Sequence, residues 1–112
     1  MDCLFCRIVA GEIPARTFYE DDRVLAFHDT GPQAPVHFLV IPRRHIASLD
    51  QLTEDDRDLA GHILYTAQRL ATEQGCEAGF RLVMNCKELG GQTVHHIHMH
   101  VLGQRQLHWP PG

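Results

Sequence analysis

The sequence predicts an α+β fold with a five-stranded antiparallel sheet, one long helix and one short helix. Three observations support this prediction. Apolar residues from Leu59 to Ala71 recur with the helical period, about five short segments are rich in strand-forming residues, and most connections between them are short. At 112 residues we expect one domain, 1–112, in which residues 103–112 form an extended C-terminal tail.

The first segments predict a short helix and two strands. Within residues 3–10 the apolar side chains fall at positions i, i+1, i+4 and i+5, which suits one face of a helix. Gly11 and Pro14 are expected to end that helix. Residues 17–20 and 24–27 then predict two strands joined by a tight turn of charged residues.

The next segments predict the rest of the sheet and the long helix. Residues 37–41 predict a buried strand that stops at a proline. Thr53 followed by three acidic residues is a typical helix start, and the helical period continues to Gly75. We expect this helix to pack on the sheet or on a second copy of itself. Residues 80–84 predict a fourth strand, and a loop over residues 86–93 leads to the fifth.

The fifth strand carries three histidines, His96, His98 and His100, which alternate with apolar residues. Successive side chains of a strand point to opposite faces, so the three imidazoles share one face while the apolar residues enter the core. A helix would scatter them, because residues two apart do not face each other there. Three imidazoles on one face indicate a functional site, since histidine titrates near neutral pH and commonly binds metals.

Composition excludes several classes of partner. The net charge of −4 with neutral histidines makes a nucleic-acid partner a poor candidate. No apolar run reaches the length of a membrane span, and the first residues lack the basic segment of a signal peptide. We therefore expect a cytoplasmic protein without nucleic-acid or membrane partners, whose four cysteines are not a disulfide framework.

Two mechanisms are open to the three histidines. They could bind a catalytic zinc that activates water, or one imidazole could be a nucleophile while its neighbours orient it and carry protons. The preceding Gly90 and Gly91 favour the second mechanism, because glycines allow backbone N–H groups to approach a phosphate oxygen closely. The carboxylate cluster that would hold magnesium beside a phosphate is missing, so no magnesium requirement is expected.

Four other residues have both a functional and a purely structural interpretation. Cys3 and Cys6, with two residues between them, suit half of a metal site, a redox pair or two small buried side chains. Asp29 could bind a pair of sugar hydroxyls or stabilise its own turn. His45 is a candidate metal ligand or an ordinary hydrogen-bonded histidine.

The segment from His96 to Leu102 resembles the His-φ-His-φ-His-φ-φ signature of the histidine triad (HIT) superfamily, in which φ is apolar. The similarity extends over nearly all of the chain, and the C-terminal ending resembles that of the Hint-like branch. The other matching segments are residues 27–29, 32–35, 41–45, Asn85, 91–93 and 108–112.

The resemblance implies a homodimer with one continuous sheet and hydrolysis of purine nucleoside phosphoramidates, which releases the nucleoside monophosphate. His98 would be the nucleophile that becomes nucleotidylated, while His100 and Thr93 would hold the phosphate and the leaving group. The residues implied to contact the nucleotide are Phe5, Ile8, Phe27, Asp29, Thr30, Asn85, Gly91, Gln92, Thr93, His98 and His100.

The resemblance also implies a zinc ion, as in many bacterial HIT proteins. Its ligands would be Cys3, Cys6, His45 and His96, and the closed site would support folding rather than catalysis. One position departs from the family pattern, since Hint-like proteins more often carry glycine where this chain has Lys87.

Three alternatives to a phosphoramidase remain. They are a dinucleoside polyphosphate hydrolase of the same superfamily, a nucleotide-binding regulatory module and the catalytic-zinc hydrolase. The tail with Trp109 argues against the first of these.

Overall fold

The computed structural model describes residues 3–112. Met1 and Asp2, which enter the prediction that no signal peptide is present, lie outside the described residues. In chain order the elements are α1 (Leu4–Val9), β1 (Thr17–Glu20), β2 (Val24–His28), β3 (Val36–Pro42), the 3-10 turns η1 (Leu49–Gln51) and η2 (Glu54–Asp56), α2 (Arg57–Glu73), β4 (Phe80–Val83), α3 (Lys87–Gly90) and β5 (Met99–Gly103).

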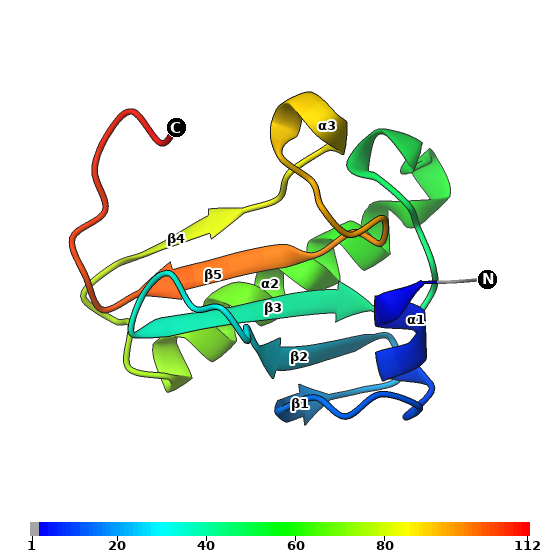
Figure 1. Ribbon diagram of the computed structural model, residues 1–112, viewed down its shortest axis with the longest axis horizontal. Coiled ribbons are helices and arrows are strands. Elements are labelled where there is room, and N and C mark those ends of the chain that lie inside the picture. Colours follow the sequence, from blue (N-terminus) through cyan, green and yellow to red (C-terminus); the bar gives the residue numbers. More distant parts are fainter. Residues whose placement is uncertain (1–2) are drawn as a thin grey trace.

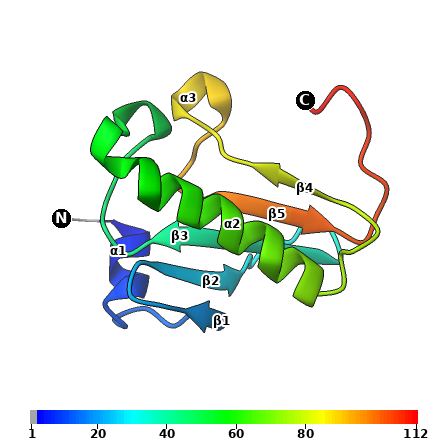
Figure 2. The ribbon, with the colours of Figure 1, turned by 180° about the vertical axis from the view of Figure 1, so that it is seen from behind.

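The strands form one sheet in the order β1-β2-β3-β5-β4, and every neighbouring pair is antiparallel. The long helix α2 lies across one face of this sheet, while α1 lies on the opposite side (Figures 1 and 2). The predicted α+β architecture is confirmed, and α2 packs on the sheet of its own chain. Across residues 3–112, no helix combines the length and apolar character needed to cross a bilayer.

The central strands β2 and β3 are buried on both faces, which explains their nearly continuous apolar sequences. Alternate residues of these strands enter two separate cores. The core on the α2 side contains Val24, Ala26, Phe38 and Val40, together with residues of α2 such as Ile63 and Leu70. The core on the α1 side contains Cys3, Phe5, Leu25, Phe27, Leu39 and Ile41.

The histidine segment keeps its predicted alternation, but β5 begins only at Met99. Ile97 and Val101 are buried in the core under α2, whereas His96 and His98 precede the strand. The pairing of β3 with β5 ends at Val40 and Met99. Just beyond, Pro42 has no N–H to donate and its carbonyl oxygen accepts from the His96 ring at 2.8 Å, so the ladder cannot continue.

Several predicted boundaries change. The expected loop 86–93 contains the helical turn α3, because the Gln92 side chain accepts the Lys87 N–H at 2.7 Å and Gly91 adopts a positive φ of 85° that reverses the chain. The helix that follows Thr53 starts with the 3-10 turn η2 before α2. Gly103 is the last residue of β5, so the tail comprises residues 104–112.

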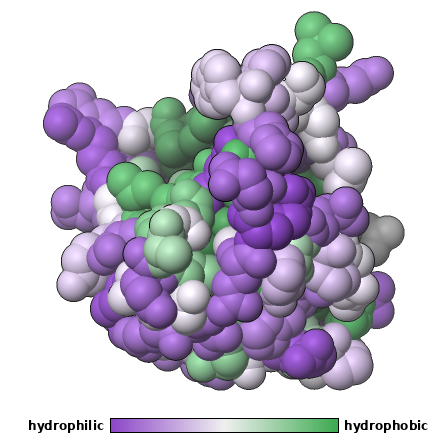
Figure 3. Space-filling view, turned by 90° about the vertical axis from the view of Figure 1, so that its left-hand side faces the viewer, coloured by the Kyte–Doolittle hydropathy of each residue, from purple (hydrophilic) through white to green (hydrophobic). Residues whose placement is uncertain are grey.

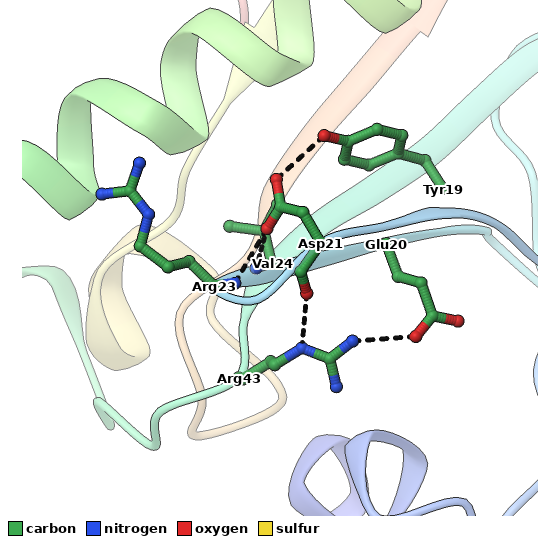
Figure 4. A network of polar contacts seen from close by, with 6 residues as sticks. All are labelled: Tyr19, Glu20, Asp21, Arg23, Val24 and Arg43. Carbon is green, nitrogen blue, oxygen red and sulfur yellow. Dashed lines mark hydrogen bonds and ion pairs between the residues drawn. The ribbon is translucent and has the colours of Figure 1, made fainter.

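A polar network around Asp21 holds the turn between β1 and β2 (Figure 4). One carboxylate oxygen of Asp21 accepts the N–H groups of Arg23 and Val24, each at 2.8 Å. The other accepts the Tyr19 hydroxyl at 2.9 Å and lies 2.7 Å from Nε2 of His62 on α2. Partial burial would raise the pKa of Asp21, but these hydrogen bonds hold it well below its usual range. The network therefore ties α2 to one edge of the sheet.

Candidate active site and metal site

A cavity of about 370 Å³ lies between α1, the end of β2 and the histidine segment. One part of its wall is apolar, and the other carries imidazoles, a carboxylate and hydroxyls. Eight of the residues predicted to contact a nucleotide line this cavity: Phe5, Ile8, Phe27, Asp29, Thr30, Thr93, His98 and His100.

Three predicted nucleotide contacts, Asn85, Gly91 and Gln92, do not line the cavity. The Gln92 side chain is buried and bonded to the backbone: its amide NH₂ donates to the carbonyl oxygens of Ala47 at 2.7 Å and Val94 at 2.9 Å. These bonds, with the one to Lys87, brace the loop that presents Thr93. In the structure Gln92 positions the loop.

The sequence prediction missed part of the wall. Residues 13–16, between α1 and β1, form one rim of the cavity, and Leu39 of β3 also lines it. Proline at position 14 signals only the end of the helix, and nothing local shows that the segment returns beside Phe27. The further lining residues that were not predicted are Leu4, Ile13, Pro14, Ala15, Arg16, His28, Leu39 and Val94.

His98 has a defined tautomer. Its Nδ1 lies 2.8 Å from the backbone carbonyl oxygen of His96. A carbonyl oxygen only accepts, so Nδ1 carries the proton and the lone pair of neutral His98 is on Nε2. Burial lowers the pKa of His98, although the bond to His96 opposes this effect. The ring is therefore neutral near pH 7 and has a free nucleophilic nitrogen.

His100 is also oriented by a chain of hydrogen bonds. The Gln33 N–H donates to Nδ1 of His37 at 3.0 Å, so the proton of neutral His37 is on Nε2. That Nε2 lies 3.0 Å from Nδ1 of His100 and donates to it, which leaves the proton of His100 on its own Nε2. Burial, followed by the charges of His98 and His37, lowers the pKa of His100 to about 4.

Asp29 contributes to both the turn and the cavity. Its Oδ1 accepts the Gly31 N–H at 2.8 Å, which confirms the turn-stabilising interpretation. Its Oδ2 lies 3.5 Å from Nε2 of His37. The sequence contained no local signal for His37, because an isolated histidine in a buried strand is usually structural. Only the pairing of β3 with β5 places it beside His100.

Within residues 3–112, two groups of side chains have the composition of a metal site. In each, the potential ligand atoms lie within 4.8 Å of one another. The group of Asp29, His37 and His100 fits poorly, because the Gln33 N–H occupies Nδ1 of His37 and places a proton on Nε2, where a metal would bind. This group suits proton transfer better than metal binding.

The second group, Cys3, Cys6, His45 and His96, fits a metal well. The Nε2–H of His96 donates to Pro42, so its Nδ1 lone pair faces the thiols, 3.4 Å from Cys3 Sγ and 3.6 Å from Cys6 Sγ. Nδ1 of His45 lies 3.3 Å from both Cys6 Sγ and His96 Nδ1. Such separations are those of a tetrahedron with metal–ligand distances of about 2.0–2.3 Å, the geometry of a Cys₂His₂ zinc site.

Comparison with known proteins agrees with this architecture. Residues 10–107 match the sequence model of the family described as HIT domain. The chain belongs to the HIT domain family. It is 50% identical over 111 residues to an uncharacterised HIT-like protein of Synechococcus elongatus, covering 99% of this chain and 97% of that protein. It is 47% identical over 113 residues to the 14 kDa zinc-binding protein of Brassica juncea, covering 99% and 100%.

Solved structures of HIT proteins superpose closely on this chain. A HIT family hydrolase from Legionella pneumophila has a TM-score of 0.97 and 52% identity, covering 99% of this chain and 100% of that one. A histidine triad protein from Clostridium difficile has a TM-score of 0.91 and 46% identity, covering 96% and 94%. The HIT fold predicted from the histidine motif is thereby confirmed.

A larger cavity, of about 490 Å³, lies at the other end of β5, between the end of α2, the start of β4 and the C-terminal segment. Figure 3 views this end of the molecule, where polar residues surround a hollow with an apolar area. Arg81 and Arg105 line the cavity, but their guanidinium groups donate to backbone oxygens of His108 and Gln33. It contains none of the histidines described above.

Lys87 has a backbone conformation that favours glycine. Its φ is 60°, in the left-handed region that L residues rarely adopt. Its Nζ forms a 2.8 Å ion pair with Asp50, outside the cavity. The Lys87 side chain thus joins α3 to η1 at the surface.

Proposed function

We propose that this HIT protein hydrolyses purine nucleoside phosphoramidates through a nucleotidylated His98. The observation that carries the proposal is the hydrogen bond from His98 Nδ1–H to the His96 carbonyl oxygen, which leaves Nε2 free in the cavity. Imidazole is a good nucleophile and, once phosphorylated, a good leaving group. The hydrolase named in the Legionella structure agrees with the reaction class.

The proposed reaction has two steps. Nε2 of His98 attacks the α-phosphorus and the P–N bond breaks, so that the amine departs with a proton taken from solvent while the Nε2–H of His100 donates a hydrogen bond to the phosphate and the leaving group. In the second step water attacks the phosphorus, its proton passes to solvent, and the bond to His98 breaks to release the nucleoside monophosphate. His37 would orient His100 during both steps through its donated hydrogen bond.

The cavity would hold the nucleotide in a single direction. Phe5 and Phe27, whose ring centroids are 5.5 Å apart, and the nearby Ile8 offer apolar surfaces for a purine. Asp29 would accept ribose hydroxyls, and Thr93 would contact the phosphate beside His98. Asn85, Gly91 and Gln92 would act on the phosphate only by shaping the loop.

The proposed metal is a structural zinc held by Cys3, Cys6, His45 and His96. The zinc-binding relative from Brassica juncea supports the identity of the metal. All four ligands of a tetrahedral site would come from the protein, leaving no position for water or substrate. The zinc would join α1, one wall of the cavity, to the segment that carries His98.

The proposed assembly is a homodimer. β4 is an edge strand, and within residues 3–112 it pairs only with β5. Two copies joined along β4 would form a continuous sheet and cover Phe80 and Leu64, which are apolar and exposed. Sedimentation at micromolar concentration should give about twice the chain mass, and a monomer would contradict the assembly.

Turnover and intermediate trapping test the function. Adenosine 5′-phosphoramidate should be hydrolysed much faster than diadenosine polyphosphates, and protein quenched during turnover should carry a nucleotidyl group on the peptide containing His98. An adduct elsewhere would contradict the mechanism. Faster cleavage of the polyphosphates would favour the other hydrolase class, and binding without turnover would favour a regulatory module.

A further inference from the structure

We propose that Arg16 reads the edge of the base and makes this protein selective for 6-oxopurine nucleotides, such as those of guanine, over adenine nucleotides. The inference rests on the proposed function, because it assigns a specificity to the same nucleotide cavity. It concerns the rim formed by residues 13–16, which lines the same cavity as His98 and His100.

The base end of the cavity is mostly apolar. Phe5, Ile8, Ile13, Pro14 and Phe27 line it. Apolar surfaces hold any flat base and cannot distinguish the hydrogen-bonding edges of two purines. Discrimination between purines therefore requires a polar side chain at this end.

Arg16 is the cationic side chain at that end. It precedes Thr17, which pairs with Phe27, and its carbonyl oxygen accepts the His28 N–H at 3.2 Å. The Arg16 backbone is thus held beside the end of β2, and its side chain is exposed at the rim. Within residues 3–112 its guanidinium has no hydrogen bond or ion pair, so its donors are available to a ligand.

The neighbouring polar groups are less available. The His28 ring stacks on Phe18, with centroids 4.6 Å apart. The Asp29 carboxylate is divided between the Gly31 N–H and His37. Arg16 therefore has both the free donors and the position to contact a base edge.

The chemistry of the guanidinium selects the base. Its fork of N–H donors matches the two adjacent acceptors O6 and N7 of guanine or hypoxanthine. On adenine the same fork meets N7 and the N6 amino group, which is itself a donor. Because the rim is open to water, the preference should be about 10-fold, toward the lower end for a bidentate arginine–guanine contact.

Calorimetric binding of GMP, IMP and AMP tests the inference. Wild-type protein should bind GMP and IMP about equally and about 10-fold more tightly than AMP. The variant Arg16→Gln should bind all three alike, and Arg16→Lys should keep little of the preference because it lacks the fork. Arg57→Gln, at an exposed arginine of α2 that pairs with Glu54, is the matched control and should keep the full preference.

The outcomes separate the two proposals. Equal binding of GMP and AMP by the wild-type protein would overturn the specificity while leaving the phosphoramidase function intact. A preference for GMP but not for IMP would overturn it as well, because the 2-amino group would then be the feature recognised. Equal weakening of all three ligands by Arg16→Gln would also overturn it, because Arg16 would then contribute only its charge to binding and would not distinguish the bases. Binding of none of them would overturn both the inference and the proposed function.

Discussion

The zinc candidate and the catalytic candidate contain the same kind of side chain and lie next to each other, yet their imidazoles are prepared differently. In His96 the Nε2–H donates to the backbone oxygen of Pro42, so Nδ1 carries the lone pair and faces two thiols. In His98 the Nδ1–H donates to the backbone oxygen of His96, so Nε2 carries the lone pair and faces the cavity. The backbone carbonyl bonded to each ring thus decides which nitrogen is available.

The second difference is the set of side chains that surrounds each ring. His96 and His45 are beside cysteines, soft ligands that favour zinc. His98 and His100 are beside His37 and Asp29, and the bond from the Gln33 N–H makes this group a poor metal site. Two adjacent groups of histidines can therefore serve folding and chemistry separately, and four changes in conditions or sequence test that separation.

The largest effect is expected for His98→Ala. Removal of the nucleophile should reduce turnover by at least ~10³-fold, while the zinc content and the fold remain, because His98 is not a ligand. Activity assays and metal analysis on the same preparation measure both. His95→Ala, at the exposed neighbouring histidine, is the matched control and should leave both unchanged. Loss of zinc in the His98 variant would mean that the two groups are not separate.

A smaller loss is expected for His37→Leu. Without the hydrogen bond that orients His100, the rate of the chemical step should fall by about 10²-fold, as for a catalytic group that is slightly misplaced. KM should change little, because His37 is buried behind the cavity. Steady-state kinetics across pH should show a displaced profile for the variant. Wild-type kcat with an unchanged pH profile would restrict His37 to a packing role.

Zinc removal should affect stability before activity. Freshly purified protein should contain about one zinc per chain, and a chelator should lower Tm while the remaining folded protein stays active. Cys6→Ser should reproduce this loss, whereas Cys86→Ser, at a cysteine outside the group, should not. Immediate loss of activity in protein that is still folded would instead indicate a catalytic metal.

The smallest effect concerns pH. Burial lowers the pKa of His37, His98 and His100, the last to about 4, below the value of about 6.5 for a free histidine. Between these pH values the unfolded chain binds more protons than the folded one, so the free energy of unfolding falls as the pH is lowered. The stability that depends on neutral histidines is therefore fully present above about pH 6.5 and is lost as the pH falls toward 4. Tm should decline over this window, and less steeply for His100→Asn. A flat Tm in wild-type protein would contradict the lowered pKa values.

The sequence alone determined the architecture, and it predicted which side chains share one face at the candidate site. The helical period from Leu59 to Ala71 predicts α2, and the alternation around the three histidines predicts that the imidazoles share one face. Both follow from periodicities that a single segment carries in itself. The resemblance to the HIT family also predicted that Cys3, Cys6, His45 and His96 form one group, and their potential ligand atoms do lie within 4.8 Å of one another.

Only the tertiary structure decided which nitrogen of each ring is free and which residues stand behind it. The tautomers of His96 and His98 depend on carbonyl oxygens that point at them, and the place of His37 behind His100 depends on the register of two strands 63 positions apart. The role of Gln92 in its loop and the place of Arg16 at the rim also depend on tertiary contacts, with Ala47 and His28 respectively. The His98–His96 bond is local, but the other contacts join residues distant in the chain, and no local pattern encodes them.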